Sequence, residues 1–184
     1  MPSIEILSEI LPSAGPLPGP EVRAGLQESC LEQRGWWIRL LVERAGWQRV
    51  TPPLTREERS RFVLAYATDC IRARVMEGEW AHSPFFAAYL VCDWFVHLWE
   101  EQPRPVALLA QFRDRFAALY REGDRYQRDV IVCGILEHLP RPRSIRQFFR
   151  NWHEDAVLRE ALIEAWAPSP PNPPGSSHPG RRRG

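Results

Sequence analysis

The stretch that decides the fold is residues 84–101, which read PFFAAYLVCDWFVHLWEE. Large apolar side chains occupy almost every position around a helix drawn through it, and such a helix is normally buried at the centre of a bundle. Ser83 and Pro84 mark its start, because a proline at the first helical position sacrifices no hydrogen-bond donor. We therefore expect a central helix over residues 84–101. Burial at about 1.5–3 kcal/mol per large side chain should supply much of the stability.

Helical periodicity continues on both sides of this stretch, from residue 20 to residue 167. Thr55 and Glu58 form a capping box that begins a helix running to near Gly78. Gly35 is expected to separate the first two helices. Residues 36–45 and 126–139 also allow a strand, and a helix is favoured for both. The remaining predicted helices cover residues 20–35, 106–121, 144–150 and 154–166.

These elements predict an all-α fold. The short connections between them favour antiparallel neighbours, so we expect a compact multi-helix bundle of about six to eight helices, built from antiparallel helical hairpins. Armadillo-like packing is one form that such hairpins can take.

The two ends of the chain differ in composition from the middle. Residues 1–19 combine a short predicted helix with a linker rich in Pro and Gly, and residues 168–184 are rich in Pro and end in an Arg triplet. Segments with so few bulky apolar residues cannot bury a core of their own. The predicted organisation is a single helical domain over residues 20–167, preceded by the short helix and linker and followed by a disordered tail.

The charge of the chain limits its partners. All 24 basic residues are arginine and 23 residues are acidic, so the formal net charge is +1. The lack of lysine excludes enzymes that depend on a Schiff-base or P-loop lysine. A charge so close to zero gives little long-range attraction to phosphate, so we expect no nucleic-acid partner.

The cysteines and the lengths of the apolar stretches indicate the cellular compartment in which the protein is expected. Cys30, Cys70, Cys92 and Cys133 form no CxxC pair and lie in apolar helical contexts, so buried, reduced thiols are expected. The sequence has neither the regions of a signal peptide nor an apolar run of membrane-spanning length. The expectation is a cytoplasmic protein that makes no contact with a membrane.

One stripe of ionisable side chains interrupts the apolar stretch. Asp93, His97 and Glu100 or Glu101 share a helix face, which Tyr89 extends. Carboxylates beside an imidazole can hold a metal ion or transfer protons. Glu79-x-x-His82, just upstream, is half of a di-iron pattern whose second half is missing. A simple Asp93–His97 ion pair at a solvent-facing edge explains the same spacing and is favoured. We expect no catalytic residue, metal or cofactor, and keep a metal-dependent or acid–base enzyme as the alternative.

Tryptophan is abundant, with eight residues in the chain. Trp and Arg are the residues most enriched at the energetic centres of protein interfaces. Trp80 lies in the loop-like segment Glu-Gly-Glu-Trp-Ala-His and is the tryptophan we most expect at a surface. It is therefore a candidate partner contact.

Residues 116–139 read FAALYREGDRYQRDVIVCGILEHL. An amphipathic helix, the acidic turn Glu122-Gly123-Asp124 and a Val/Ile-rich helix ending in Leu-Glu-x-Leu follow one another here. Over roughly residues 106–139 this order resembles small all-helical bacterial immunity-type domains, the partners of polymorphic toxins. The resemblance implies a non-enzymatic protein that neutralises a toxin by direct binding. Glu122 and Asp124, which fall in the turn, join Trp80 as predicted partner contacts. A further alternative for the function is a helical adaptor or regulator unrelated to toxins.

Overall fold

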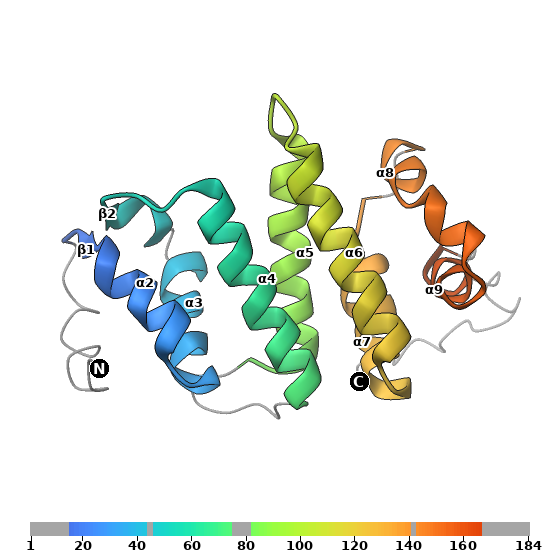
Figure 1. Ribbon diagram of the computed structural model, residues 1–184, viewed down its shortest axis with the longest axis horizontal. Helices are drawn as coiled ribbons and strands as arrows, with labels where there is room; N and C mark the ends of the chain where they lie inside the picture. Colours follow the sequence, from blue (N-terminus) through green and yellow to red (C-terminus); the bar gives the residue numbers. More distant parts are fainter. Residues whose placement is uncertain (1–14, 44–45, 75–81, 141–142, 167–184) are drawn as a thin grey trace, which may run out of the picture.

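Helix α5, Pro84–Glu100, stands between α4, Arg56–Ala73, and α6, Val106–Glu122, and runs antiparallel to both (Figure 1). The computed structural model describes residues 15–43, 46–74, 82–140 and 143–166. Those residues form eight α-helices and only two very short strands, which confirms the predicted all-α fold. The other five helices are α2 Gly19–Glu28, α3 Leu31–Glu43, α7 Arg125–Ile131, α8 Arg143–Phe148 and α9 Ala156–Trp166.

The helices succeed one another along the long axis of the molecule in approximate chain order (Figure 1). Helices α2 and α3 lie at one end and α8 and α9 at the other. Short 3₁₀ segments, Gly46–Arg49 and Arg150–Glu154, precede β2 and α9. In the described part of the chain, no helix combines the length and the apolar character needed to cross a membrane.

The core is centred on Phe95 of α5, whose side chain is fully buried. Its ring centroid lies 6.0–6.3 Å from the centroids of five other aromatic rings. Those rings come from α5 itself, from α6, and from α8 and the residue that follows it: Trp99, Phe112, Phe116, Phe148 and Phe149. Phe95 therefore packs α5 against both α6 and the α8 segment.

Helix α5 is less buried than its apolar sequence predicted, because its solvent-facing side is wider than the edge expected at Asp93 and His97. Its neighbours cover about two thirds of its circumference, and the remaining face is open to solvent along the whole helix. The exposed face carries aromatic residues in its first half and ionisable residues in its second: Phe85, Phe86, Tyr89, Asp93, His97 and Glu100. These positions fall within about 120° of arc when successive residues are separated by 100°. An apolar sequence thus does not require a helix to be surrounded.

The capping box of α4 forms as predicted. The Thr55 side chain accepts a hydrogen bond from the Glu58 amide, and the Glu58 carboxylate accepts one from the Thr55 amide at 2.8 Å. The same carboxylate accepts a 2.7 Å hydrogen bond from Arg23 of α2, and these interactions lower its pKa to about 2. The helix ends at Ala73, where Arg74 takes a left-handed conformation. The expected end near Gly78 lies outside the described residues.

The N-terminal region differs from the prediction in two ways. Leu17–Pro18 (β1) pairs in parallel with Val50–Thr51 (β2), and Leu17 is buried in the core. The predicted linker therefore does not extend to residue 19, because its last residues pack into the domain. Gly35 lies inside α3 and does not separate two helices, since the break falls at Ser29 and Cys30.

Two of the four cysteines are exposed, although all four were expected to be buried. Cys70 and Cys92 are buried, and burial raises the pKa of the first thiol to about 11 and that of the second to about 12. Cys30 lies at the α2–α3 junction and Cys133 on the outer side of the turn after α7, so both face solvent. An apolar sequence context does not specify which way a junction residue points.

The segment expected to be helical over residues 126–139 is helical, and the strand alternative was wrong. Helix α7 continues into a π-helical turn, Val132–Leu136, in which the Glu137 amide donates to the Val132 carbonyl at 2.9 Å. This turn packs closely on α5 at Gly134. A Cβ placed on Gly134 would lie only 2.8 Å from the Cβ of Ala88. The glycine is therefore required by the close approach of the two elements.

We expect Gly134→Ala to lower the free energy of unfolding by about 1–2 kcal/mol, because overpacking outweighs the higher helix propensity of alanine. Urea denaturation followed by circular dichroism measures this. Ala88→Gly removes the opposing methyl group, so the double variant should lose less stability than the sum of the two single variants. If the losses of the two single variants were strictly additive, contact with Ala88 would not be what restricts position 134 to glycine.

Candidate protein-interaction surface

Four aromatic side chains form an exposed cluster on α5 and α7, called the aromatic patch below. Tyr89 is 49% exposed, Phe85 and Phe86 are each 40% exposed, and Tyr126 is 36% exposed. The Phe85 and Tyr126 rings meet edge to face with centroids 5.9 Å apart, and those of Phe86 and Tyr89 lie 6.4 Å apart. The ring of His138 lies 5.7 Å from Tyr89 at the edge of the patch. The rings thus form two contacting sets, Phe85 with Tyr126 and Phe86 with Tyr89 and His138, which adjoin where Phe85 and Phe86 follow each other on α5.

Local hydrogen bonds set the positions of the helices that carry the patch. At the start of α5, Ser83 Oγ accepts a 3.3 Å hydrogen bond from the Phe86 amide. At the start of α7, Asp124 and Gln127 form a capping box. Gln127 also donates through Nε2 to the Ile71 carbonyl at 3.2 Å, which ties α7 to the end of α4.

A buried histidine lies beneath the patch. His82 is 3% exposed, and its ring centroid lies 4.7 Å from that of Phe86. The Tyr66 hydroxyl accepts a 3.1 Å hydrogen bond from the His82 amide and lies 3.1 Å from the ring nitrogen Nδ1. The contact with the hydroxyl engages Nδ1, one of the two ring nitrogens of His82. Among the described residues, no group forms a hydrogen bond with the other ring nitrogen, Nε2.

Burial is the main reason that the charged form of this imidazole is disfavoured. It lowers the pKa of His82 to about 4, and the positive charge of Arg39 acts in the same direction. Burial likewise raises the pKa of Tyr66. At neutral pH His82 and Tyr66 are therefore both uncharged, and the His82 ring packs beneath Phe86 as a neutral side chain.

The predicted contacts Glu122 and Asp124 are both exposed, and both form ion pairs with arginines near the end of α4. Glu122 accepts a 2.8 Å hydrogen bond from Arg72, and Asp124 pairs with Arg74. The Arg74 guanidinium lies 5.9 Å from the centroid of the Tyr126 ring. The structure thus places Asp124 beside the aromatic patch, through Arg74. Trp80, the third predicted contact, lies outside the described residues.

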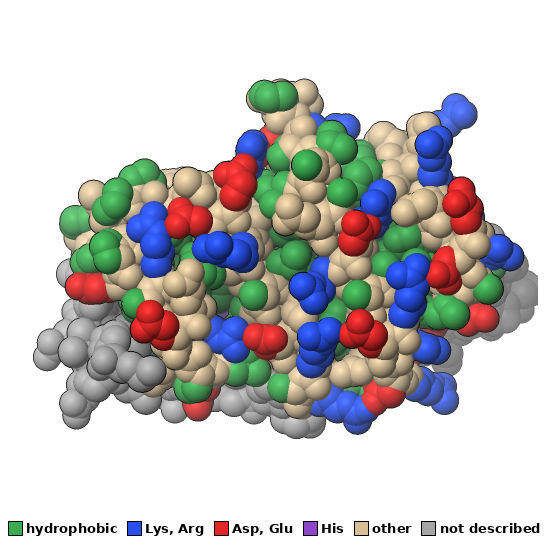
Figure 2. All heavy atoms as spheres, in the orientation of Figure 1, with side chains coloured by type: hydrophobic (Ala, Val, Ile, Leu, Met, Phe, Trp, Pro, Cys, Tyr) green, Lys and Arg blue, Asp and Glu red, His purple; other side chains and the backbone are tan. Residues whose placement is uncertain are grey.

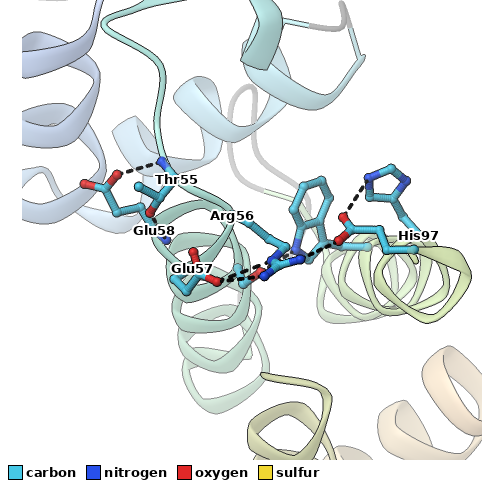
Figure 3. A network of polar contacts seen from close by, with 8 residues as sticks. Thr55, Arg56, Glu57, Glu58 and His97 are labelled. Carbon is cyan, nitrogen blue, oxygen red and sulfur yellow. Dashed lines mark hydrogen bonds and ion pairs between the residues drawn. The ribbon is translucent and has the colours of Figure 1, made fainter. Parts of the chain in front are cut away.

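The alternative metal site is arranged as a solvent-exposed surface network. Asp93, His97 and Glu100 all face solvent. His97 Nε2 lies 3.7 Å from Glu101, which also accepts a 2.8 Å hydrogen bond from Arg56 of α4 (Figure 3). In the part of the chain that the structure describes, no three His, Cys, Asp or Glu side chains are grouped so that they could hold a metal ion.

The upstream half of the di-iron pattern is not assembled either. Glu79 lies outside the described residues, and Nδ1 of His82 is already engaged by Tyr66. The expected Asp93–His97 ion pair does not form among the described residues, because His97 lies beside Glu101 instead. Glu101 in turn connects α5 to the start of α4 through Arg56.

A groove with a volume of about 840 Å³ lies between α4 and α6. Acidic and basic residues alternate along its walls, among them Asp69, Arg72, Asp114 and Arg115. The face shown in Figure 2 has the same character, with arginine and acidic side chains interspersed. A groove of such mixed charge favours neither an anionic nor a cationic ligand.

The clustering of exposed rings in the aromatic patch was not predicted, although Tyr89 was placed on the face of the ionisable stripe. Asp93 and His97 mark the solvent-facing side of α5, and steps of four residues back from Asp93 lead to Tyr89 and Phe85. Residues spaced in this way share a helix face. The exposed polar stripe could therefore have been used to predict that Tyr89 and Phe85 also face solvent.

Comparisons with protein-family models, with curated proteins and with solved structures found no match to this chain. The resemblance of residues 106–139 to immunity-type domains therefore stays a prediction.

Proposed function

We propose that this chain is a protein-binding domain that holds its partner at the aromatic patch. The observation that carries the proposal is the clustering of four large rings, each more than a third exposed, on one surface of two adjoining helices. Exposed apolar clusters of this kind mark interaction sites, and aromatic residues dominate binding energy at interface centres. Arg74 and Asp124 supply a polar rim at the Tyr126 side.

We further propose that the partner is a bacterial toxin, which the chain neutralises by direct binding. Support comes from the resemblance over residues 106–139, because that segment supplies both Tyr126 and the adjacent Asp124. Glu122 and Trp80 stay predicted contacts of the same interface. A helical adaptor unrelated to toxins would use the same patch on a different partner, so the identity of the partner separates the two functions.

We expect Phe85→Ala combined with Tyr89→Ala to weaken partner binding by about 100-fold, since each lost anchor costs at least about tenfold. The measurement is calorimetric titration of the full chain against the toxin-like protein encoded beside its gene. Ile163→Ala is the matched control, because Ile163 is 60% exposed on α9 and lies outside the patch. All variants should stay folded at the temperature of the titration, which circular dichroism verifies.

Two results would contradict this proposal. Unchanged affinity in the double variant, or an equal loss in the Ile163 control, would remove the aromatic patch as the binding surface. If no toxin-like neighbour exists, or if the neighbour does not bind, the immunity role fails and a protein-binding role with another partner is left.

A further inference from the structure

A second groove, with a volume of about 550 Å³, lies where the end of α5, the start of α6 and helix α8 meet. Three arginines line it, Arg104, Arg113 and Arg150, and no Asp or Glu is among the described residues that do so. The rings of Trp99 and Phe148 also line it. The groove is therefore basic and aromatic, unlike the larger groove of mixed charge between α4 and α6.

Ring contacts hold two of these guanidinium groups in place. Arg104 lies 4.2 Å from the centroid of the Trp99 ring and donates through Nε to the Trp99 carbonyl at 2.7 Å. Arg113 lies 5.1 Å from the centroid of Phe148 and hydrogen-bonds Asp114 at 2.9 and 3.0 Å. A guanidinium stacked on a ring keeps N–H groups in its own plane available to a carboxylate.

Within the described ranges, two of the three arginines lack an acidic partner. Asp114 offsets the charge of Arg113, whereas no carboxylate of the described residues forms an ion pair with Arg104 or Arg150. Both side chains are exposed. Their charge is therefore available to a ligand that enters the groove.

The sequence around the groove strengthens this positive charge. Between Glu137 and Glu154 the chain contains four arginines and no acidic residue. Two of the four, Arg143 and Arg146, are exposed on α8. By contrast, residues 1–167 as a whole carry 21 arginines against 23 acidic residues, so this basic charge is local.

We propose that this groove binds a short acidic peptide segment of a partner protein, with carboxylates at Arg104 and Arg150. Val106, which lines the groove and is 59% exposed, offers an apolar contact to a side chain between those carboxylates. The slightly acidic body disfavours a nucleic acid, which needs an extended basic surface. The C-terminal tail of this chain carries arginines and no carboxylate side chain, so its charge does not complement the groove.

This site is separate from the aromatic patch. Phe85 and Trp99 are fourteen residues apart on α5, which corresponds to about 21 Å along the helix. The inference does not depend on the toxin partner, and each surface can be tested with the other intact.

The test is titration of the full chain into a short fluorescein-labelled peptide rich in Glu with central Leu and Phe residues, followed by fluorescence anisotropy at low ionic strength. We expect saturable binding with a Kd on the order of 10 μM. Arg104→Gln combined with Arg150→Gln should weaken it at least about tenfold. The same peptide with Gln in place of Glu should not bind.

Matched controls make the result specific. Arg115→Gln removes an exposed arginine from the α4–α6 groove, and together with the patch variant Phe85→Ala/Tyr89→Ala it should leave peptide affinity within about twofold of wild type. Absence of saturable binding, or an equal loss in Arg115→Gln, would overturn the proposal. It would also be overturned if inorganic phosphate or a single-stranded oligonucleotide bound this groove more tightly than the peptide.

Discussion

Replacing Phe95 with alanine is expected to lower the free energy of unfolding by about 3–5 kcal/mol, the range typical of a buried Phe→Ala change. The Phe95 side chain is fully buried and lies against five other rings, so its loss leaves a cavity where α5, α6 and the α8 segment meet. Urea denaturation followed by tryptophan fluorescence and by circular dichroism measures the change. If the alanine variant does not fold, Phe95→Leu provides the milder test, with an expected loss of about 1 kcal/mol.

Phe86→Ala is the matched control, since it makes the same substitution on the same helix. Phe86 is 40% exposed and belongs to the aromatic patch. Its loss should cost less than about half as much as that of Phe95, because the area removed from water on folding is smaller. Equal losses at the two positions would contradict the division of α5 into a buried and an exposed face.

Acid should destabilise the chain through His82. The folded-state pKa is lowered to about 4 from the ordinary value of 6.5, so the unfolded state binds a proton more readily than the folded state. The contribution of His82 to the free energy of unfolding is therefore fully present above pH 6.5 and is lost as the pH falls towards 4. Between pH 7 and about pH 4.5 the expected loss is about 2 kcal/mol. Urea denaturation at a series of pH values measures it.

His82→Gln is the variant that isolates this effect, because glutamine does not titrate. Other groups, including Glu58, contribute equally to the wild type and to the variant, so the difference between their pH profiles reports His82 alone. Parallel profiles over this range would show that the buried imidazole is not the source of the acid sensitivity.

The two proposed surfaces lie towards opposite ends of α5 and differ in chemistry. The aromatic patch, at Phe85 and Tyr89, offers apolar rings with a narrow polar rim. The basic groove, at Trp99 and Arg104, offers guanidinium groups held by ring contacts. A partner that combined an apolar anchor with a separate acidic segment would engage both, and the two sets of variants distinguish the contributions.

Local interactions explain why parts of the fold could be predicted. The cap at Thr55 formed as expected because it depends on a side chain and an amide three residues apart. The cap at Asp124 forms over the same short separation. Helix starts and helix periodicity are short-range properties of the same kind. The sequence by itself therefore determined the all-α class and the identity of the central helix.

Contacts between distant residues decided the rest. Which third of α5 stays open depends on how α4, α6 and the π-helical turn pack against it. The Gly134–Ala88 approach, which sets one of those distances, joins residues 46 positions apart. The ring pair Phe85–Tyr126 and the groove between Arg104 and Arg150 span similar separations. The sequence therefore determined which segments are helical, and only the tertiary structure decided which apolar rings and which arginines remain exposed, because exposure depends on neighbours that periodicity within one segment does not specify.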